Sequence, residues 1–177
     1  VVAYTHDYAE NSPLIRRYFK KLEVINPPVI LPKIEKSEVI EFRKIHNPMN
    51  RFPVIAMAAR FATEKGVEVL LASLTKVIKK FPNALVWFAG PYKNILGEEH
   101  YFKRLEPLIN DLMEKDHWRF LGVLSPSQMV SFYSNIDALV VPSLNSTEAF
   151  GLVQVEAMMH KVPVVASNLP GVRQPAK

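Results

Sequence analysis

Two carboxylates flank a glycine in the C-terminal third of the sequence. Glu148 and Glu156 lie on either side of Gly151 in the segment Ser146–Met158, which follows the apolar run Ala138–Val141 and a polar loop. This order predicts a strand, a loop over its carboxyl end and the first turn of a helix. The unpaired amides and the dipole of a helix N-terminus attract phosphate. Carboxylates beside an anion site make sense if the ligand also carries hydroxyl groups, as a nucleotide sugar does.

The spacing of the two glutamates fits such a ligand. On one continuous helix they would lie about 12 Å apart along the axis and about 80° apart around it. With Glu148 in the loop, the separation roughly spans a pyrophosphate between two sugars. Each charge-assisted hydrogen bond from a hydroxyl to a carboxylate contributes about 1.5–3 kcal/mol. The simpler alternative is that Glu156 lies on a solvated helix face and Glu148 complements the helix dipole, worth about 0.3–1 kcal/mol.

Arg60 and Lys65 are the cations that could serve the same ligand. Both follow the apolar run Val54–Ala59, and Gly66 comes next at the expected start of a helix. A guanidinium and an ammonium at the end of a strand could neutralise a diphosphate. Two ordinary loop cations would give the same pattern. Arg60 and Lys65 therefore indicate a diphosphate site only when they are considered together with the two glutamates.

Other common chemistries find no support in the sequence. The chain has no cysteine, which excludes disulfides and thiolate nucleophiles. It contains no Gly-x-Gly-x-x-Gly, phosphate-loop or Gly-x-Ser-x-Gly motif. The histidines lack the spacing of metal ligands and are expected to be surface or packing residues. They are His6, His46, His100, His117 and His160.

Composition fits an ordinary folded domain, and its mild positive charge suits an anionic ligand but is explained more simply by a solvated basic surface. Lysine and arginine number 22 against 17 aspartates and glutamates, a net charge of +5, and no arginine-rich stripe interleaved with aromatic residues occurs. No apolar run approaches the roughly 20 residues of a membrane span, and the first residues do not resemble a signal peptide. We therefore expect a cytoplasmic protein. Because the chain starts without methionine on an expected strand, we expect it to be a fragment.

The elements that must position these residues alternate regularly from Pro53 onward. Strands are predicted at Val54–Ala59, Ala84–Ala89, Trp118–Leu121, Asp137–Val141 and Val162–Ser167. Helices are predicted at Lys65–Phe81, at Glu99–Lys115 with a kink or restart at Pro107, after a capping box at Ser125–Gln128, and after Glu148. Such alternation predicts an α/β fold, namely a Rossmann-like doubly wound parallel sheet.

The first 50 residues are less regular. They predict a strand at Val1–Thr5, a basic helix at Ser12–Lys21 opened by Ser12-Pro13, an edge strand or linker at Leu22–Leu31 and a short helix at Ser37–His46. The basic helix fits a solvated face better than a membrane surface.

Glycine placement indicates which edge of the sheet carries the site. Gly90 and Gly122 end strands, whereas Gly66 and Gly151 start helices, so four of the six glycines fall at the carboxyl edge. In open α/β sheets this is the edge at which ligands bind.

Taken in order, these motifs resemble the retaining glycosyltransferases of family 4, the group 1 glycosyltransferases with the GT-B fold. The similarity runs from about Val54 to Val172, and Glu148–Glu156 is similar to the family's Glu-x₇-Glu signature. Each motif is weak by itself, but the ordered set is specific. The segments are Ala59–Gly66, Phe88–Gly90, Phe120–Gly122, Val141–Ser143, Glu148–Glu156, Pro163–Ser167 and Pro170–Arg173.

The resemblance implies two Rossmann-like domains that hold donor and acceptor between them. Residues 1–20 would be the tail of the N-terminal acceptor domain. Residues 21–177 would be the C-terminal nucleotide-sugar-binding domain, without its last strand and closing helices.

The resemblance also implies roles by position. Arg60 and Lys65 would hold the donor diphosphate and stabilise it as the leaving group, and Glu148 would bind the transferred sugar near the reacting carbon. These three would be the catalytic residues, with no metal and no cofactor beyond a UDP-, GDP- or ADP-linked donor sugar. The remaining donor-binding residues would be Glu156 at the ribose hydroxyls, the amides of Phe150, Gly151 and Leu152 at the phosphates, and Val123 and Leu124 at the base.

Four positions depart from the family pattern. Ala59 replaces a glycine before the arginine, which is expected to be tolerated. Tyr92 replaces a second glycine after Gly90 and should change the loop near the donor, and Gln174 stands where glutamate is common. Lys161 replaces a glycine, so the preceding helix is expected to end differently.

The expected function is retaining transfer of a glycosyl group, of hexosyltransferase type, to a sugar, lipid or small-molecule acceptor held by the missing N-terminal domain. Attack on the same face through an oxocarbenium-like state is expected, and the fragment alone should be inactive. The resemblance allows peripheral membrane association of the full-length protein, and no nucleic-acid partner is expected. Two alternatives stay open, a GT-B-fold nucleotide-sugar epimerase and a nucleotide-sugar-binding module without turnover.

Overall fold

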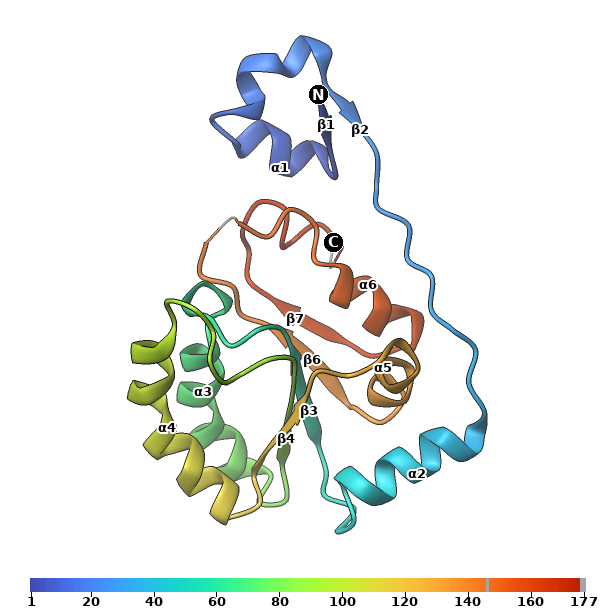
Figure 1. The fold of residues 1–177 in the computed structure, drawn as a ribbon, viewed down its shortest axis with the longest axis vertical. Helices are drawn as coiled ribbons and strands as arrows, with labels where there is room; N and C mark the ends of the chain where they lie inside the picture. Colours follow the sequence, from blue (N-terminus) through green and yellow to red (C-terminus); the bar gives the residue numbers. More distant parts are fainter. Residues whose placement is uncertain (146, 176–177) are drawn as a thin grey trace.

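The centre of the molecule is a parallel sheet of five strands in the order β5-β4-β3-β6-β7 (Figure 1). The computed structural model describes residues 1–145 and 147–175. The chain steps outward from β3 to β5 and then returns to the other side of β3. The predicted doubly wound parallel sheet is confirmed, and its switch point lies between β3 and β6. The strands are β3 (Val54–Ala58), β4 (Leu85–Ala89), β5 (Trp118–Gly122), β6 (Ala138–Val141) and β7 (Val164–Ala166).

Strand β4 explains why two of the predicted strands, Val54–Ala59 and Ala84–Ala89, are unbroken apolar runs. All five of its residues are buried, because helices cover both faces of the sheet and successive side chains point to opposite faces. Val86 and Phe88 pack with residues of α3 (Val67–Lys80) and α4 (Glu99–Glu114). Leu85, Trp87 and Ala89 pack on the other face, with residues of α2 (Lys36–His46), α5 (Pro126–Tyr133) and α6 (Leu152–Met159).

The helices of the regular part lie close to their predicted bounds. The capping box of α5 is confirmed, since the Gln128 amide donates to Ser125 Oγ and the Ser125 amide donates to Gln128 Oε1. Helix α4 runs through Pro107 as one element, so the predicted restart does not occur. Pro107 lies on the exposed side of α4, while Leu105 and Ile109 are buried in the core. Packing of the buried face holds the helix together across the missing amide.

The predicted basic helix Ser12–Lys21 is wrong in its bounds. Helix α1 occupies His6–Asn11, and Ser12 is its C-cap. The reason is local, because Thr5 Oγ1 accepts from the Tyr8 amide at 3.0 Å and caps the helix earlier than expected. A separate 3₁₀ helix, η1 (Ile15–Lys21), follows Pro13.

The N-terminal elements form a small unit of their own above the main sheet (Figure 1). Strands β1 (Val2–Ala3) and β2 (Glu23–Val24) pair in parallel, flanking α1 and η1. Residues 25–35 then run without helix or strand to α2, which confirms a linker after a strand of only two residues. The assignment of residues 1–20 to a preceding domain stays a prediction.

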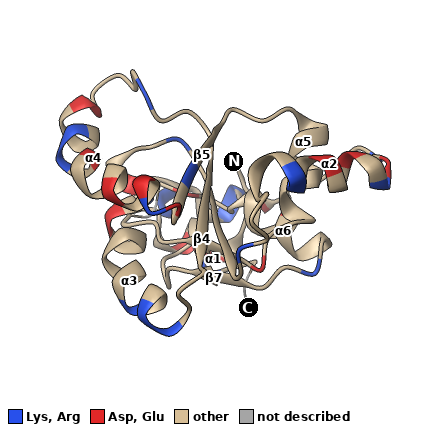
Figure 2. Ribbon diagram, turned by 90° about the horizontal axis from the view of Figure 1, so that it is seen from below, with Lys and Arg blue, Asp and Glu red and all other residues tan. Residues whose placement is uncertain are grey.

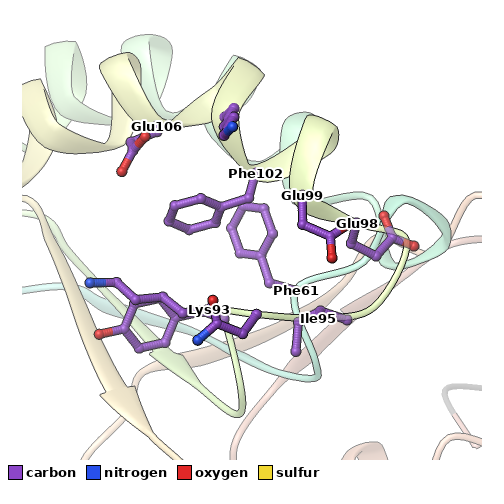
Figure 3. A pocket seen from close by; sticks show the side chains of 10 residues that line it. Phe61, Lys93, Ile95, Glu98, Glu99, Phe102 and Glu106 are labelled. Atoms are coloured by element: carbon purple, nitrogen blue, oxygen red, sulfur yellow. The ribbon is translucent and has the colours of Figure 1, made fainter.

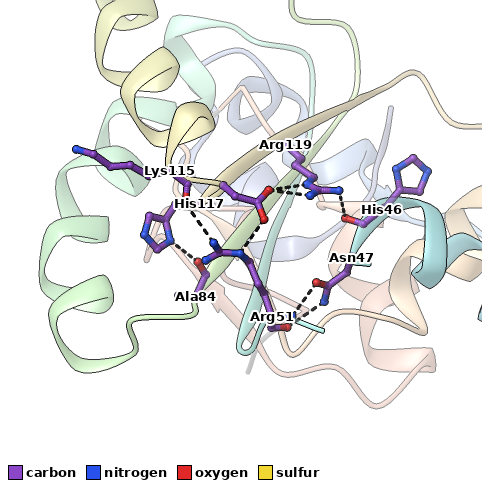
Figure 4. Close-up of polar contacts among 8 residues, drawn as sticks. His46, Asn47, Arg51, Ala84, Lys115, His117 and Arg119 are labelled. Carbon is purple, nitrogen blue, oxygen red and sulfur yellow. Dashed lines mark hydrogen bonds and ion pairs between the residues drawn. The ribbon is translucent and has the colours of Figure 1, made fainter. Parts of the chain in front are cut away.

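A polar network joins the amino ends of the strands (Figure 4). Asp116 accepts from Arg51 Nε at 2.8 Å and from Arg119 Nη2 at 2.7 Å, and Arg119 also donates to the carbonyl of His46. Burial raises the pKa of Asp116, but the hydrogen bonds and charges of Arg119 and Arg51 outweigh it and hold that pKa below its ordinary value. Burial and the charge of Arg119 lower the pKa of His46. The network is structural, because it lies at the edge opposite the predicted site.

Candidate functional site

The two loops at the switch point of the sheet are joined by close backbone contacts. Gly66, between the 3₁₀ turn η2 (Thr63–Lys65) and α3, has a φ of 70°. A Cβ at this position would lie 2.0 Å from the carbonyl oxygen of Pro142, in the loop after β6. The Leu144 amide donates to the Glu64 carbonyl at 2.9 Å. Glycine therefore lets the β3–α3 loop, which carries the cations, lie against the β6–α6 loop, which carries Glu148.

The contact brings Lys65 and Glu148 together. Lys65 Nζ donates to Glu148 Oε2 at 2.7 Å, and each side chain is 21% exposed. The pair is sheltered but open to a ligand. An ammonium has three donors, so Lys65 can keep this carboxylate and still donate to a second anion.

A cavity of about 240 Å³ lies beside this pair at the switch point. It collects side chains from the ends of β3 and β6, and thus unites the three predicted catalytic residues Arg60, Lys65 and Glu148. Arg60 also donates to Glu64 Oε1 at 2.5 Å while staying about half exposed. The other lining residues are Met57, Ala58, Ala59, Val140, Val141, Ser143 and Val153.

Ser143 is a member of this site that the sequence-based prediction did not include. It is 4% exposed and lines the cavity, yet its Oγ has no hydrogen-bond partner among the described residues. A buried hydroxyl without a partner destabilises a protein unless something else satisfies it. The Val141–Ser143 motif was visible in the sequence, but the burial of the hydroxyl depends on loops distant in sequence.

Glu156 lies outside the cavity and has a partner of its own. Its Oε2 accepts from the Tyr133 hydroxyl at 2.6 Å, and it does not line the cavity with the three catalytic candidates. Tyr133 is fully buried, and burial together with the Glu156 carboxylate raises its pKa. The ring of His160 stacks on Tyr133 with 5.6 Å between centroids. One carboxylate oxygen of Glu156 is thereby fixed in place.

The start of α6 is as predicted. Gly151 is the N-cap with a φ of 80°, and no side chain of the described residues caps the helix. The helix begins at Leu152, directly after Phe150 and Gly151. The backbone amides of its first turn therefore have no side-chain acceptor at the cap.

Val123 and Leu124 follow β5, two strands away from β3 in the sheet. Val123 is 75% exposed, whereas Leu124 packs against the core cluster of the α2–α5–α6 face. Neither lines the cavity around Lys65. Of the two, only Val123 presents its side chain broadly to solvent at this edge.

Two of the departures from the family pattern have visible consequences. Tyr92 stacks on Phe120 with 3.9 Å between ring centroids and helps to line a second cavity of about 240 Å³ beside α4 (Figure 3). Lys161 has a φ of 62°, and the Lys161 and Val162 amides donate to the carbonyls of Met158 and Ala157. The expectation of a different helix end is wrong, because Lys161 itself adopts the left-handed conformation that glycine usually supplies.

Neither a metal cluster nor a membrane helix occurs in the part of the chain that the structure describes. No group of three or more histidine, aspartate or glutamate side chains there could hold a metal ion. No helix among the described residues is long and apolar enough to cross a membrane.

Charged side chains of both signs are interspersed on α2 and α4 (Figure 2). The net charge of +5 is therefore not gathered on these helices into a surface of one sign. The cations that matter for the site are the two at its cavity.

Sequence comparison relates this chain to a family of known proteins. The family profile of glycosyl transferases group 1 matches residues 38–177. The chain is 34% identical over 172 residues to a D-inositol 3-phosphate glycosyltransferase of Corynebacterium diphtheriae, covering 92% of this chain and 39% of that protein. It is 36% identical over 110 residues to a phosphatidyl-myo-inositol mannosyltransferase of Mycolicibacterium smegmatis, covering 62% of this chain and 26% of that protein.

Among solved structures, the chain is similar to Anabaena Alr3699/HepE in complex with UDP and glucose. The TM-score is 0.74 at 25% identity, covering 97% of this chain and 45% of that one. The catalytic domain of starch synthase IV from Arabidopsis thaliana has the same fold, with a TM-score of 0.72 at 14% identity, covering 98% of this chain and 40% of that one. The chain thus spans less than half the length of these proteins.

Proposed function

Because the chain belongs to the family of group 1 glycosyltransferases, we propose that it binds the nucleoside diphosphate sugar donor of a glycosyl transfer. The observation that carries this proposal is the convergence of Arg60, Lys65, Ser143 and Glu148 on one cavity at the switch point. Two cations, a buried hydroxyl and a carboxylate match a diphosphate linked to a polyhydroxylated ring.

The diphosphate would lie against Lys65, Arg60 and the N-terminus of α6. In the transfer, the bond between the anomeric carbon and the diphosphate oxygen breaks, and its electron pair stays on that oxygen. Charge therefore develops where an ammonium, a guanidinium and the amides of a helix start are already oriented. These groups would do the work that a divalent cation does in other enzymes, so we propose a metal-independent reaction.

Glu148 would serve the sugar end of the donor. Its Oε2 is held by Lys65, which leaves acceptor capacity on the carboxylate for sugar hydroxyls. The acceptor oxygen would form the new bond to the anomeric carbon on the face that the diphosphate leaves, and its proton would pass to the departing diphosphate oxygen. This proposal gives retention of configuration.

Glu156 would bind the ribose hydroxyls. Tyr133 occupies one carboxylate oxygen and fixes the direction in which the other can accept. Val123, exposed after β5, would lie toward the base. This assignment predicts that nucleoside diphosphates bind more tightly than inorganic pyrophosphate.

The acceptor and the setting of the full-length protein are also proposals. A sugar, lipid or small molecule would be bound by the domain to which the N-terminal unit belongs. The absence of cysteine supports a cytoplasmic location. The basic residues of η1 fit a solvated face, and a peripheral membrane contact of the full-length protein would also use the exposed side chain of Leu14 beside them.

Calorimetric titration with UDP, GDP and ADP tests the binding function directly. At least one of the three should bind, and thermal unfolding in its presence should shift upward. Ligand at 100 times its dissociation constant stabilises by about 2.7 kcal/mol. Absence of heat and of any shift with all three nucleotides at millimolar concentration would contradict the proposal.

Turnover is tested separately in the complete protein. Release of nucleoside diphosphate from the donor should depend on an added acceptor. Binding without turnover, with acceptors of all three classes, would favour a non-catalytic nucleotide-sugar-binding module.

A further inference from the structure

The carboxylate of Asp7, in the first turn of α1, reaches the turn that follows β7. It accepts from the Gly171 amide at 3.0 Å, from Arg173 Nε at 3.0 Å and from Arg173 Nη2 at 2.5 Å. Asp7 and Arg173 are 166 positions apart in sequence. The two-point contact of a guanidinium with a carboxylate fixes direction as well as distance. The side chains of Asp7 and Arg173 are only 15% and 27% exposed, respectively, so the contact is sheltered.

The same turn supports the backbone of the loop that carries Glu148. Gly171 has a φ of 81°, and a Cβ on it would lie 2.5 Å from the carbonyl oxygen of Glu148 and 2.9 Å from that of Ala149. The next residue, Val172, is fully buried. Its carbonyl accepts from Gln154 Nε2 at 2.7 Å, in the first turn of α6. The turn is therefore wedged against both the loop that carries Glu148 and the start of α6.

These contacts form a continuous chain from the N-terminal unit to the cavity. Asp7 holds the turn at Gly171 and Arg173, the turn touches the backbone of Glu148, and the carboxylate of Glu148 meets Lys65. Each link is a direct contact. Movement of Asp7 must therefore either break a contact or change the support of Glu148.

We propose that Asp7 is a positioning residue for Glu148, so that docking of the N-terminal unit orders the donor-side carboxylate. The functional meaning of this inference rests on the proposed donor-binding role of Glu148. Because coupling between two sites is reciprocal, occupancy of the donor site would in turn hold the N-terminal unit in place. The site would then be complete only when the unit is seated.

Hydrogen–deuterium exchange of the ligand-free 177-residue chain tests the proposal. In Asp7→Asn, the amides of residues 147–155 should exchange about tenfold to a hundredfold faster, the range expected for loss of a sheltered charge-assisted contact. The amides of β3 and β4 should keep their wild-type rates. Asp111→Asn is the matched control, because its carboxylate pairs with Lys115 on the exposed face of α4, and it should change neither region.

Two conservative variants separate positioning from a merely structural role. Asp7→Glu keeps the charge and should recover part of the protection of residues 147–155. Arg173→Lys keeps the charge but loses the two-point contact, and should give an intermediate rate. Unchanged exchange at 147–155 in Asp7→Asn would overturn the proposal, and so would an equal rise throughout β3 and β4. Since no nucleotide is present, this result does not depend on whether the proposed binding function holds.

Discussion

The ammonium of Lys65 lies 2.7 Å from a carboxylate oxygen of Glu148, although the two residues are 83 positions apart. The contact exists because β3 and β6 are neighbours in the sheet and because Gly66 lets their following loops touch. It places a cation for phosphate and an acceptor for sugar hydroxyls at one cavity. The two charges should affect ligand binding in opposite directions.

Lys65→Met should weaken binding of the nucleoside diphosphate about tenfold to a hundredfold. The variant loses charge-assisted hydrogen bonds worth about 1.5–3 kcal/mol and leaves Glu148 without its partner beside an anion. Calorimetry with whichever of UDP, GDP and ADP binds the wild type measures the effect. Lys76→Met, at an exposed position of α3, should bind as the wild type does. Equal affinity of the two variants would exclude Lys65 from the phosphate site.

Glu148→Gln should have the opposite effect on the diphosphate alone. Loss of the carboxylate removes a competing anion from Lys65, so affinity for the nucleoside diphosphate should rise about twofold to fivefold. Glycosyl transfer by the complete protein should fall sharply, because the acceptor for the sugar hydroxyls is weakened. Parallel titrations of Glu148→Gln and Lys65→Met decide this. A loss of diphosphate affinity as large as that of Lys65→Met would mean that Glu148 contacts the phosphates through water or orients Lys65 for them.

Ser143→Ala should weaken nucleotide binding without destabilising the folded chain. Its hydroxyl makes no hydrogen bond within the described residues, so its removal should not lower the free energy of unfolding and should raise it by up to about 1 kcal/mol. Nucleotide affinity should nevertheless fall about fivefold, the loss of one hydrogen bond to the ligand. Urea unfolding and calorimetry measure the two quantities.

Ser134→Ala is the control for that substitution, because the Ser134 hydroxyl donates to the Val130 carbonyl at 2.8 Å. It should lower stability by about 1 kcal/mol and leave affinity unchanged. A reversal of the two patterns would assign Ser143 to the structure and not to the ligand.

Gly66→Ala should destabilise the chain by about 3 kcal/mol or more, because two costs add. A methyl group would meet the Pro142 carbonyl oxygen at 2.0 Å, and the positive φ brings strain of about 1–2 kcal/mol. Gly97→Ala is the matched control, since Gly97 has a φ of 82° but no atom within 4 Å of an added methyl group. It should show the strain alone, about 1 kcal/mol. Chemical unfolding measures both variants. A larger loss of stability in Gly66→Ala than in Gly97→Ala would show that the contact between the two loops requires glycine at position 66, whereas equal losses would assign the requirement to backbone conformation alone.

Asp116 should contribute stability that depends on pH. Arg119 and Arg51 hold its pKa below the ordinary value in the folded state, so this contribution is present above about pH 4 and is lost as the pH falls through the folded pKa. At pH 7, Asp116→Asn should lower the free energy of unfolding by about 1 kcal/mol. The difference from the wild type should shrink between about pH 5 and about pH 2. A difference that stays constant over this range would mean that the side chain acts through packing or neutral hydrogen bonds.

The sequence by itself determined the succession of elements and the edge of the sheet at which the site lies. Apolar runs located β3 and β4 because strands covered on both faces leave little room for polar residues. Local capping chemistry located α5, since its signals lie within four residues of one another. The same local reasoning failed at Ser12, where Thr5 supplied an earlier cap.

Only the tertiary structure decided which of the residues at the carboxyl edge meet. The order β5-β4-β3-β6-β7 makes the loops after β3 and β6 neighbours, and thereby joins Lys65 to Glu148. It also buries the hydroxyl of Ser143 and directs Glu156 to Tyr133. The contact between Asp7 and Arg173 joins the two ends of the chain. Residue types and periodicity report local preference, whereas these contacts depend on how distant elements pack, which no short stretch of sequence specifies.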